Sequence, residues 1–588
     1  MASTYWQKTE LKEKRFFENK LIRKEGSMSE IDQPWVENLT IGQVLRETAR
    51  RHPHEDAFVF VDSGERTTWE QFDRDTDRLA KGLLSLGLKP GDHFGVWATN
   101  IPEWARLQYA TARIGVVLVT INPSYRTTEL EYTLRQADVV GLALIDAYKT
   151  SDYFAALLEV CPELSACTAG QQLDSKTFPK LRRVISLRGQ PQPGMLSWQD
   201  LLSSADKVSD KELSKIEAQL HPLAPINIQY TSGTTGQPKG ATLSHRNILL
   251  SAYYCGENQK LSHTDRLCIP VPLYHCFGCV LGTLCCVVHG STMIFPAESF
   301  HPEKTLRALE QEKCTALYGV PTMFIAQLEH ETYPKRDLSS LRTGMMAGSP
   351  CPLEVMKRVT EHMGASDITI GYGQTETSPL VTQTCTNDPI ELRVGSVGRT
   401  VPGLEAKIVD PETSNELGDQ QPGELCVRGH AVMIGYYNQP EETAAVIDPD
   451  GWLHTGDLAQ RDTNGYYRIT GRIRDLIIRG GENIYPREIE EFLYKHPAIE
   501  DVQVVGVPDR KFGEEVLACV KLRDGQSATE ADLREFCSET LAHFKIPHYW
   551  KFVESFPTTV TGKIQKYKIR EQAIEELGLQ EAAQIETA

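Results

Sequence analysis

Ile228-Gln-Tyr-Thr-Ser-Gly-Thr-Thr-Gly-Gln-Pro-Lys-Gly240 is the stretch of this 588-residue sequence that decides the fold. An apolar strand is expected at 226–230. The residues that follow it are Thr231, Ser232, Gly233, Thr234, Thr235, Gly236, Gln237, Pro238 and Lys239. Glycines let backbone N–H groups approach an oxyanion, hydroxyls add hydrogen-bond donors, and a lysine adds positive charge. It is not a Walker A loop, since no Gly-Lys-Ser/Thr follows at the required spacing. We interpret it as a phosphate-binding loop within a hairpin, against the alternative of a surface turn rich in small residues.

Helical and strand patterns alternate on the N-terminal side of this loop. Apolar positions recur at helical spacing in 41–52 and 69–86, and short apolar strands stand at 58–62, 94–98, 116–121, 139–145 and 184–187. Such alternation predicts an α/β body built on largely parallel, buried sheets. We expect a large N-terminal domain of several subdomains, one of them β-rich near residues 394–462.

The C-terminal part of the chain has its own pattern. Residues 488–574 hold a helix, strands at 502–507 and 516–522, a second helix and a short apolar segment at 552–553. That is enough for a small α+β domain, with a boundary near 471–475. We expect four parts: a mobile extension or misassigned start at 1–27, a large domain at 28–471, a small domain at 472–575 and a tail at 576–588.

Composition narrows the classes of partner. Hydrophobic residues make up 40% and charged residues 24% of the chain, as in an ordinary globular protein. The net charge of −17 argues against a nucleic acid or an anionic membrane as partner. Residues 269–297 carry no charge and are long enough to span a bilayer, but prolines and glycines interrupt them. We expect a loop, a buried helix at 277–288 and a strand at 292–295, with no integral membrane segment.

Cysteines raise a second question. Cys276 and Cys279 form a Cys-x-x-Cys beside His275, which is compatible with zinc or redox chemistry. No second pair follows at zinc-like spacing, and fourteen cysteines over this length are too sparse for a disulfide scaffold. Free cysteine is also a good small core residue, and we favour that interpretation.

The loop at Thr231–Lys239 resembles the phosphate loop of the adenylate-forming superfamily, which comprises acyl-CoA synthetases, luciferases and the adenylation domains of nonribosomal peptide synthetases. The resemblance extends over residues 37–568. It includes, in order, Tyr372-Gly-Gln-Thr-Glu376, Gly423-Glu-Leu-Cys-Val-Arg-Gly429, Gly435-Tyr-Tyr-Asn438, Trp452-Leu-His-Thr-Gly-Asp457, Gly471-Arg472 and Pro557-Thr-Thr-Val-Thr-Gly-Lys563. Two further segments, at 272–276 and 478–488, are similar to those of medium-chain fatty acyl-CoA ligases.

The resemblance implies a nucleotide site, and the residue types suit it. Glu376 can hold Mg²⁺, a hard ion that prefers carboxylate oxygens, and Thr375 can donate to the α-phosphate. The ring of Tyr372, followed by Gly373, can stack on adenine. Asp457 can accept both ribose hydroxyls, and Arg472 can reinforce that grip. The opposing wall of the adenine site is implied to be Gly348, Ser349 and Pro350.

The resemblance also implies catalytic groups. Lys563 can bridge the entering carboxylate and the pentavalent phosphorus, where negative charge develops. His275 resembles a gate of the acyl pocket, although a lone histidine beside a hydrophobic helix is as often structural. Family members alternate two orientations of the small domain, here a lid, about a hinge at the position of Arg474. In the second orientation Gly480 and Gly481 would line the path of the coenzyme A arm.

The implied reaction has two steps. A fatty acid and ATP give an acyl-adenylate and pyrophosphate, and coenzyme A then gives the thioester and AMP. ATP, Mg²⁺ and coenzyme A are therefore the expected cofactors, and medium-chain acids the expected substrates. An amino-acid substrate is disfavoured because residues 273–277 hold no acid for its ammonium group. A ligase that passes acyl-AMP to a carrier protein, or a nucleotide-binding scaffold without activity, remains an alternative.

Location and assembly are only weakly indicated. Residues 1–26 mix basic and acidic side chains without an apolar run, unlike a secretory signal, and a mitochondrial transit peptide would be poor in acids. We expect a cytoplasmic protein, with the mitochondrial matrix as the alternative. The sequence leaves a homodimer open.

Overall fold

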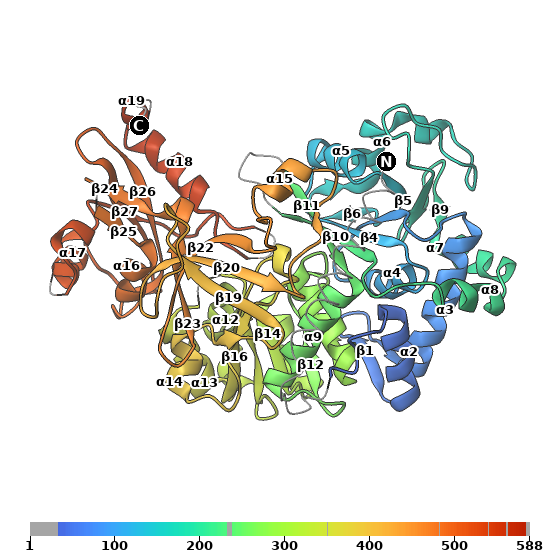
Figure 1. The fold of residues 1–588 in the computed structure, drawn as a ribbon, viewed down its shortest axis with the longest axis horizontal. Helices are drawn as coiled ribbons and strands as arrows, with labels where there is room; N and C mark the ends of the chain where they lie inside the picture. Colours follow the sequence, from blue (N-terminus) through green and yellow to red (C-terminus); the bar gives the residue numbers. More distant parts are fainter. Residues whose placement is uncertain are drawn as a thin grey trace.

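In the computed structural model, the described residues are 33–231, 238–349, 351–480, 482–538, 540–559 and 562–583, without the side chains of Asn483 and Ala583. The predicted extension at 1–27 lies outside them. Figure 1 shows one large body, coloured from blue through yellow to orange at α15, beside a smaller C-terminal unit in dark orange and red. This arrangement confirms the predicted fold class.

The first sheet of the body has eight strands and contains the hairpin that was identified in the sequence. β10 and β11 pair antiparallel, with Thr231 opposite Lys239, and on its other side β10 runs parallel to β4. Every residue of β3 and β4 is buried, as expected for inner strands covered on both faces. The strand order is β21 (Gly435–Tyr436), β11 (Lys239–Ser244), β10 (Pro225–Thr231), β4 (Val117–Ile121), β3 (His93–Trp97), β5 (Val139–Leu144), β8 (Arg183–Ser186) and β9 (Leu196–Ser197).

The second sheet has nine strands. Its six central strands run parallel, and antiparallel strands close both ends. The predicted strand at 292–295 is β13 of this sheet. The strand order is β18 (Arg399–Thr400), β17 (Thr382–Gln383), β16 (Asp367–Tyr372), β15 (Thr343–Ala347), β14 (Ala316–Gly319), β12 (Arg266–Cys268), β13 (Thr292–Phe295), β1 (Asp56–Phe60) and β2 (Glu65–Thr68).

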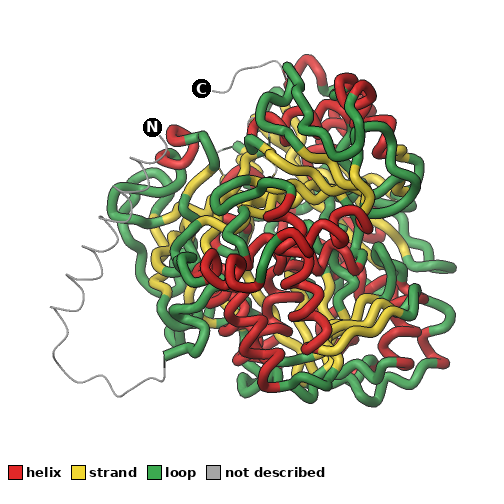
Figure 2. The backbone as a smooth tube through the Cα atoms, turned by 90° about the vertical axis from the view of Figure 1, so that its right-hand side faces the viewer, coloured by secondary structure: helices red, strands yellow, loops and turns green. Residues whose placement is uncertain are grey.

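Helices form a layer that both sheets share. The helix α9 contacts β10 and β11 of the first sheet and β16 of the second, and Figure 2 shows helices gathered in the middle of the body with strands around them. The predicted helix at 41–52 is α2, whose N-cap Thr40 forms a reciprocal capping box with Gln43. The layer contains α2 (Ile41–Arg51), α3 (Trp69–Ser85), α4 (Pro102–Arg113), α9 (His245–Gln259), the π-helix η3 (Phe277–Leu284) and α10 (Cys285–His289).

Further helices lie around this frame. α5 packs on β5 and α6, while α11, α12 and α14 pack on β12, β14 and β16 of the second sheet. Their bounds are α5 (Thr127–Gln136), α6 (Tyr153–Val160), α7 (Trp198–Ser203), α8 (Asp210–Glu217), α11 (Pro302–Gln311), α12 (Pro321–Leu328), α13 (Leu353–His362), α14 (Ile390–Gly395) and α15 (Pro440–Ala444).

The uncharged window at 269–297 is interior structure. The predicted helix at 277–288 is η3 followed by α10, and every residue of η3 is buried. No helix in the described part of the chain is long and apolar enough to cross a bilayer. Cys276 and Cys279 are also buried, and among the described residues neither belongs to a group that could hold a metal ion. The core interpretation of these cysteines therefore fits.

A four-stranded antiparallel sheet follows the body and confirms the predicted β-rich subdomain. Its strands are β19 (Leu404–Val409), β20 (Gly423–Gly429), β22 (Leu453–Arg461) and β23 (Tyr467–Arg472), in that order. β23 leads through the short turn Ile473–Asp475 into the C-terminal unit. The hinge position predicted at Arg474 lies in this turn.

The C-terminal unit is a small α+β domain with its own core. Buried aliphatic residues of α16, β26, β27 and α17 form that core. The sheet contains β25 (Glu482–Ile484), β24 (Ile477–Arg479), β27 (Gly513–Leu522), β26 (Ile499–Asp509) and β28 (Tyr549–Phe552). Its helices are α16 (Pro486–Leu493), α17 (Glu530–Ser538), α18 (Lys566–Glu576) and α19 (Gln580–Ala583).

Candidate active site

The predicted site residues of the body follow the carboxyl ends of parallel strands from both sheets. Thr231 ends β10, Gly348 follows β15, and Tyr372 ends β16. Open α/β sheets bind ligands at this edge because the loops that leave the strands converge there. The topology thus brings together segments that are more than a hundred residues apart in the sequence.

Glu376 lies at the centre of these loops and is buried, in the short turn Thr375–Thr377. Its Oε1 accepts hydrogen bonds from the hydroxyls of Thr231, at 3.1 Å, and Tyr436, at 2.8 Å. Burial, reinforced by the Glu376 charge, raises the pKa of Tyr436. Within the described residues, Oε2 of Glu376 receives no hydrogen bond. A carboxylate with one oxygen fixed and the other available fits the predicted Mg²⁺ ligand.

The predicted adenine and ribose residues are joined to one another. Asp457 accepts a 2.8 Å hydrogen bond from the Tyr372 hydroxyl through Oδ2, and its Oδ1 lies 2.9 Å from Nε of Arg472. Burial and the Asp457 charge raise the pKa of Tyr372 far above its usual value. Asp457 and Arg472 face each other across β22 and β23. The β-rich subdomain therefore contributes one wall of the site.

His275 stands in the loop before η3, and Thr375 approaches that loop from the turn at 375–377. Oγ1 of Thr375 lies 3.5 Å from Sγ of Cys276, and Nδ1 of His275 accepts a 3.1 Å hydrogen bond from the amide of Phe277. Burial lowers the pKa of His275 well below its usual value, and the nearby Lys563 charge lowers it further. His275 is thus a neutral group with Nδ1 in use, which fits a wall of a pocket better than a proton donor.

Lys563 reaches this centre from the C-terminal unit. A Cβ placed on Gly348 would lie 3.4 Å from Cε of Lys563, so the lysine chain passes over the predicted adenine wall. Burial lowers the pKa of Lys563; the Arg472 charge lowers it further, while Glu376 and Asp457 oppose the change. The charged groups of the nucleotide site therefore act electrostatically on this lysine.

Two positions favour glycine, one because of the close approach of another group and one because of its backbone conformation. A Cβ on Gly373 would lie 1.9 Å from the carbonyl oxygen of Pro379. Gly348 has φ +87°, a backbone conformation that favours glycine. Ser349 follows Gly348 and accepts a 3.5 Å hydrogen bond from the Cys351 thiol through its carbonyl oxygen.

The phosphate-binding loop is described only at its ends. Ser232, Gly233, Thr234, Thr235, Gly236 and Gln237 lie outside the described residues, as do Pro350 and Gly481. Pro238 precedes β11 and accepts a hydrogen bond from the Tyr132 hydroxyl. The ammonium group of Lys239 forms an ion pair with Glu442 at α15, beside the Tyr436 ring.

Gly480 is not among the residues that the structure brings together. Its amide donates to the carbonyl of Phe512 at 2.8 Å, and the neighbouring Arg479 pairs with Glu515 at 2.7 Å. All these partners belong to the C-terminal unit, and β24 lies at its outer side in Figure 1. The predicted coenzyme A role of Gly480 and Gly481 would require the unit to turn.

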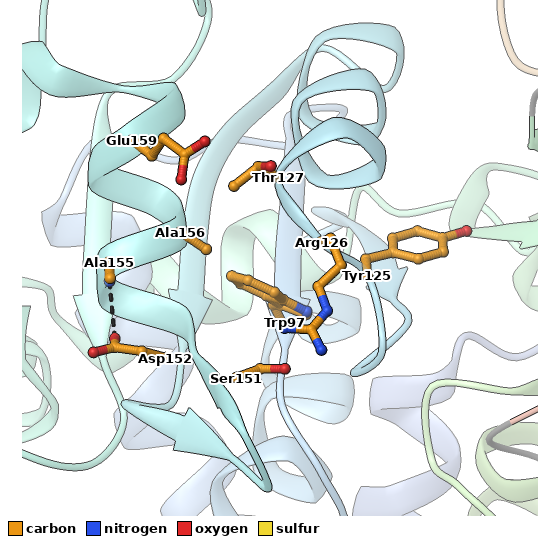
Figure 3. A pocket seen from close by; sticks show the side chains of 9 residues that line it. All are labelled: Trp97, Tyr125, Arg126, Thr127, Ser151, Asp152, Ala155, Ala156 and Glu159. Atoms are coloured by element: carbon orange, nitrogen blue, oxygen red, sulfur yellow. Dashed lines mark hydrogen bonds between the residues drawn. The ribbon is translucent and has the colours of Figure 1, made fainter.

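A cavity of about 230 Å³ lies elsewhere in the body, at the end of β3, between the start of α5 and α6. Figure 3 shows Trp97 and Arg126 between the two helices that border it, and Asp152 capping α6 through the amide of Ala155 at 2.9 Å. No predicted site residue lines it. The lining is Trp97, Tyr125, Arg126, Thr127, Ser151, Asp152, Ala155, Ala156 and Glu159.

Three residues of the site were given no role from the sequence. Tyr436 binds Glu376, Glu442 pairs with Lys239, and Thr322 donates to the carbonyl of Gly562 at 3.1 Å. Tyr436 stands in the motif at 435–438, so its position offered a signal. Glu442 and Thr322 stand outside the recognised motifs, and only the fold brings them to the site.

Two family profiles match most of the chain, and curated relatives match it over nearly its whole length. The profile of the AMP-binding enzymes matches residues 45–437, and that of the AMP-binding enzyme C-terminal domain matches 488–563. The putative acyl-CoA synthetase YngI of Bacillus subtilis is 51% identical over 92% of this chain and 98% of its own length. The human mitochondrial medium-chain acyl-CoA ligase ACSF2 is 39% identical over 98% of this chain and 96% of its own length.

Solved structures share the fold. The anthranilate CoA ligase AuaEII in complex with anthranoyl-AMP superimposes with a TM-score of 0.80 at 26% identity, covering 94% of this chain and all of that one. ATP-bound MatB from Rhodopseudomonas palustris gives a TM-score of 0.76 at 27% identity, over 91% of this chain and 99% of its own.

Proposed function

We propose, from the premise that this chain belongs to the AMP-binding enzymes and among them to the acyl-CoA ligases, that it joins medium-chain fatty acids to coenzyme A. The proposed reaction cleaves ATP to AMP and pyrophosphate and passes through an acyl-adenylate. The curated relatives named above support an acyl-CoA product, and ACSF2 supports the chain length.

The position of Lys563 is the observation that carries this proposal. An ammonium group among Glu376, Asp457 and Arg472 lies where an attacking carboxylate would meet the α-phosphorus. Both are anionic, so a fixed cation lowers the cost of bringing them together and stabilises the charge on the pentavalent phosphorus. The first half-reaction needs this arrangement of body and lid.

The remaining groups would hold the nucleotide. The Asp457 carboxylate is oriented by Tyr372 and Arg472 and can accept the ribose hydroxyls, and the Tyr372 ring can cover adenine. Thr375 can donate to the α-phosphate. Lys239 would exchange Glu442 for a phosphate oxygen, because both partners are anions and the ion pair is partly open to solvent.

Glu376 would hold Mg²⁺ through the oxygen that Thr231 and Tyr436 leave available. The ion, when bound, neutralises phosphate charge during phosphoryl transfer. The protein's own contribution is to keep Oε1 fixed by two hydroxyls, so that the carboxylate needs little reorganisation when the nucleotide arrives.

Thioester formation would use a second lid orientation. Arg474 in the turn at 473–475 is the proposed hinge, and rotation there would withdraw Lys563 and bring Gly480 and Gly481 to the site. Small residues at these positions would let the coenzyme A arm pass. Leucine in place of Gly481 should spare acyl-AMP formation and block thioester formation.

An apolar pocket for the acyl chain would lie beyond His275. Phe277 stacks on Tyr318 with ring centroids 5.4 Å apart, and both rings are buried with no acidic side chain in η3. Each methylene that enters should contribute about 0.8 kcal/mol until the pocket ends. An aliphatic carboxylic acid is the substrate that such a lining favours.

Turnover on a series of straight-chain acids from C4 to C16 with ATP and coenzyme A tests the proposal. We expect AMP and thioester in equal amounts, with the largest kcat/KM at medium chain length. A preference for acetate or an amino acid would contradict the substrate. Acyl-AMP without thioester would favour delivery to a carrier protein, and no ATP cleavage with any acid would favour a scaffold.

Location and assembly remain predictions. The vertebrate ACSF2 proteins are named as mitochondrial, whereas the predicted location of this chain is the cytoplasm. Fractionation of cells that produce the full chain would decide between them, and light scattering of the purified protein would test the homodimer.

A further inference from the structure

Three side chains with metal-ligand atoms meet on the four-stranded sheet, apart from the nucleotide-binding residues. Glu424 and Cys426 belong to β20 and His454 to β22, and one ligand atom from each lies within 4.8 Å of the other two. We propose that Glu424, Cys426 and His454 form a second cation site, which binds a borderline-soft divalent ion such as Zn²⁺. This site is additional to the proposed ligase activity and does not depend on it.

The strand pairing places two of the three side chains opposite each other. Cys426 lies opposite His454 in the antiparallel ladder, and Glu424 stands two residues before Cys426 on the same strand, hence on the same side of the sheet. Glu424 and Cys426 are buried and His454 is half-buried. The ladder shifts register between Glu424, which pairs with Leu458, and Cys426, so the three ligand atoms meet beside a β-bulge, and the half-open histidine gives an ion a path inward.

The distances are close to those of a tetrahedral site. Nδ1 of His454 lies 2.8 Å from Oε2 of Glu424 and 3.4 Å from Sγ of Cys426. With ordinary zinc bond lengths, tetrahedral ligands are separated by about 3.4 Å for N and O and by about 3.6 Å for N and S. Since Nδ1 faces both atoms, small side-chain rotations would open the space that an ion needs.

The donor types select the class of ion. A thiolate, an imidazole and a carboxylate together are typical of zinc, whereas Mg²⁺ and Ca²⁺ prefer oxygen ligands alone. Water would fill the fourth position. Coordination would replace the Cys426 thiol proton, which passes to solvent. The proton on Nδ1 that now serves the bond to Glu424 would also pass to solvent while solvent protonates Nε2, so the imidazole stays neutral.

Two cationic side chains near the group are held against the Trp452 ring. Arg428, two residues after Cys426 on β20, has its Cζ 4.5 Å from the ring centroid. Lys407 faces Cys426 from β19, but its ammonium group lies 4.4 Å from the centroid of the Trp452 ring. Oε1 of Glu424 accepts a 3.0 Å hydrogen bond from the amide of Gly456, which leaves Oε2 for the ion. Gly456 precedes Asp457, so a bound ion would brace the turn that carries the proposed ribose ligand.

A second group of the described residues, His52, Glu55 and His263, serves as a comparison. Its two imidazole rings stack, with centroids 4.7 Å apart and planes inclined by 16°. Nitrogen lone pairs lie in the ring planes, so those of stacked rings run alongside each other and do not converge on one ion. The geometry therefore favours the group on β20 and β22.

Metal titration of the full-length protein, without ATP, fatty acid or coenzyme A, tests the site. Co²⁺ should bind one equivalent with a thiolate-to-cobalt charge-transfer band, and Zn²⁺ should displace it and raise the melting temperature. Cys426→Ala should abolish the band and weaken Zn²⁺ binding by at least about 100-fold, since even loss of an outer-shell partner costs 10- to 100-fold. The half-buried free thiol Cys385 gives the matched control Cys385→Ala, which should behave as the wild type, as should His263→Ala.

His454→Gln provides a second variant should Cys426→Ala fold poorly, and circular dichroism checks the fold of both. Absence of the charge-transfer band in the wild type, or its persistence in Cys426→Ala or His454→Gln, would overturn the proposal. Because ligase substrates are left out, that failure would not bear on the proposed ligase activity.

Discussion

The hydroxyl of Thr322 donates a 3.1 Å hydrogen bond to the backbone carbonyl of Gly562, the residue that precedes Lys563. Thr322 belongs to α12 of the body and Gly562 to the C-terminal unit, so the bond joins the two. A Cβ on Gly562 would lie 3.0 Å from both Thr322 Oγ1 and Val320 Cγ2. The position of the lysine loop is therefore set by contacts from residues 320–322, away from the reacting groups.

Thr322→Val should slow acyl-AMP formation by roughly 2- to 12-fold, because one net hydrogen bond contributes about 0.5–1.5 kcal/mol. In the proposed second lid orientation this bond would be broken, because Gly562 would move away from α12 together with Lys563. Thioester formation from supplied acyl-AMP should be unaffected or faster.

Thr322→Ser retains the hydroxyl and should act as the wild type. Equal losses in both half-reactions would show that Thr322 serves stability instead of orientation. Pyrophosphate release and thioester formation are the two measurements.

Lys563→Ala should slow acyl-AMP formation by at least roughly 10²- to 10³-fold, the usual effect of losing one charge-stabilising group. ATP binding should weaken far less, because Asp457 and Arg472 still hold the nucleotide. The same variant, supplied with acyl-AMP and coenzyme A, should make thioester at nearly the wild-type rate. Lys568, exposed on α18, supplies the control Lys568→Ala, for which no change is expected. Impairment of both half-reactions by Lys563→Ala would argue for a structural lysine.

Tyr436→Phe should raise the Mg²⁺ concentration required for half-maximal activity several-fold, with a smaller effect on kcat at saturating Mg²⁺. The hydroxyl is one of two donors to Oε1 of Glu376, and its loss leaves the carboxylate freer to rotate. Tyr437→Phe, at the adjacent position, removes a hydroxyl that binds Asp138 at 3.1 Å and should leave the Mg²⁺ requirement unchanged. Identical Mg²⁺ curves for Tyr436→Phe and wild type would contradict the positioning role.

His245→Asn should make the melting temperature less sensitive to acid. His245 is fully buried, its Nδ1 accepts a 3.2 Å bond from the Ile41 amide, and burial lowers its pKa to about 3. The folded state thus binds fewer protons than the unfolded state between about pH 3 and 6.5. The contribution of neutral His245 to the free energy of unfolding is therefore fully present above pH 6.5. It is lost as the pH falls, by up to about 1.4 kcal/mol per pH unit.

Asparagine keeps an acceptor for Ile41 without the titrating ring. The variant should melt lower than the wild type at pH 8, because a cavity remains, but should lose less between pH 6.5 and 4.5. His301→Asn, at an exposed histidine, should follow the wild type throughout. Scanning fluorimetry across this pH range measures all three proteins, and parallel curves for His245→Asn and wild type would refute the assignment.

The sequence by itself determined the architecture. Alternation of apolar strands with amphipathic helices predicted the α/β body, since the periods of 2 and 3.6 residues report which side of each element is buried. It also predicted the hairpin around the loop at 231–239, although Lys239 and Gly240 begin the second strand and do not form the turn. The resemblance of its motifs to those of the adenylate-forming superfamily pointed to Glu376, Asp457, Arg472 and Lys563 as chemically significant.

Only the tertiary structure decided how these residues meet. The ion pair of Lys239 with Glu442 and the bond from Thr322 to Gly562 join segments that lie about 200 and 240 residues apart, and no local pattern encodes such pairs. The cation group at Glu424, Cys426 and His454 arises from the register of β20 against β22. Register and lid orientation depend on the packing of whole sheets and domains, which the sequence specifies only through the sum of many contacts.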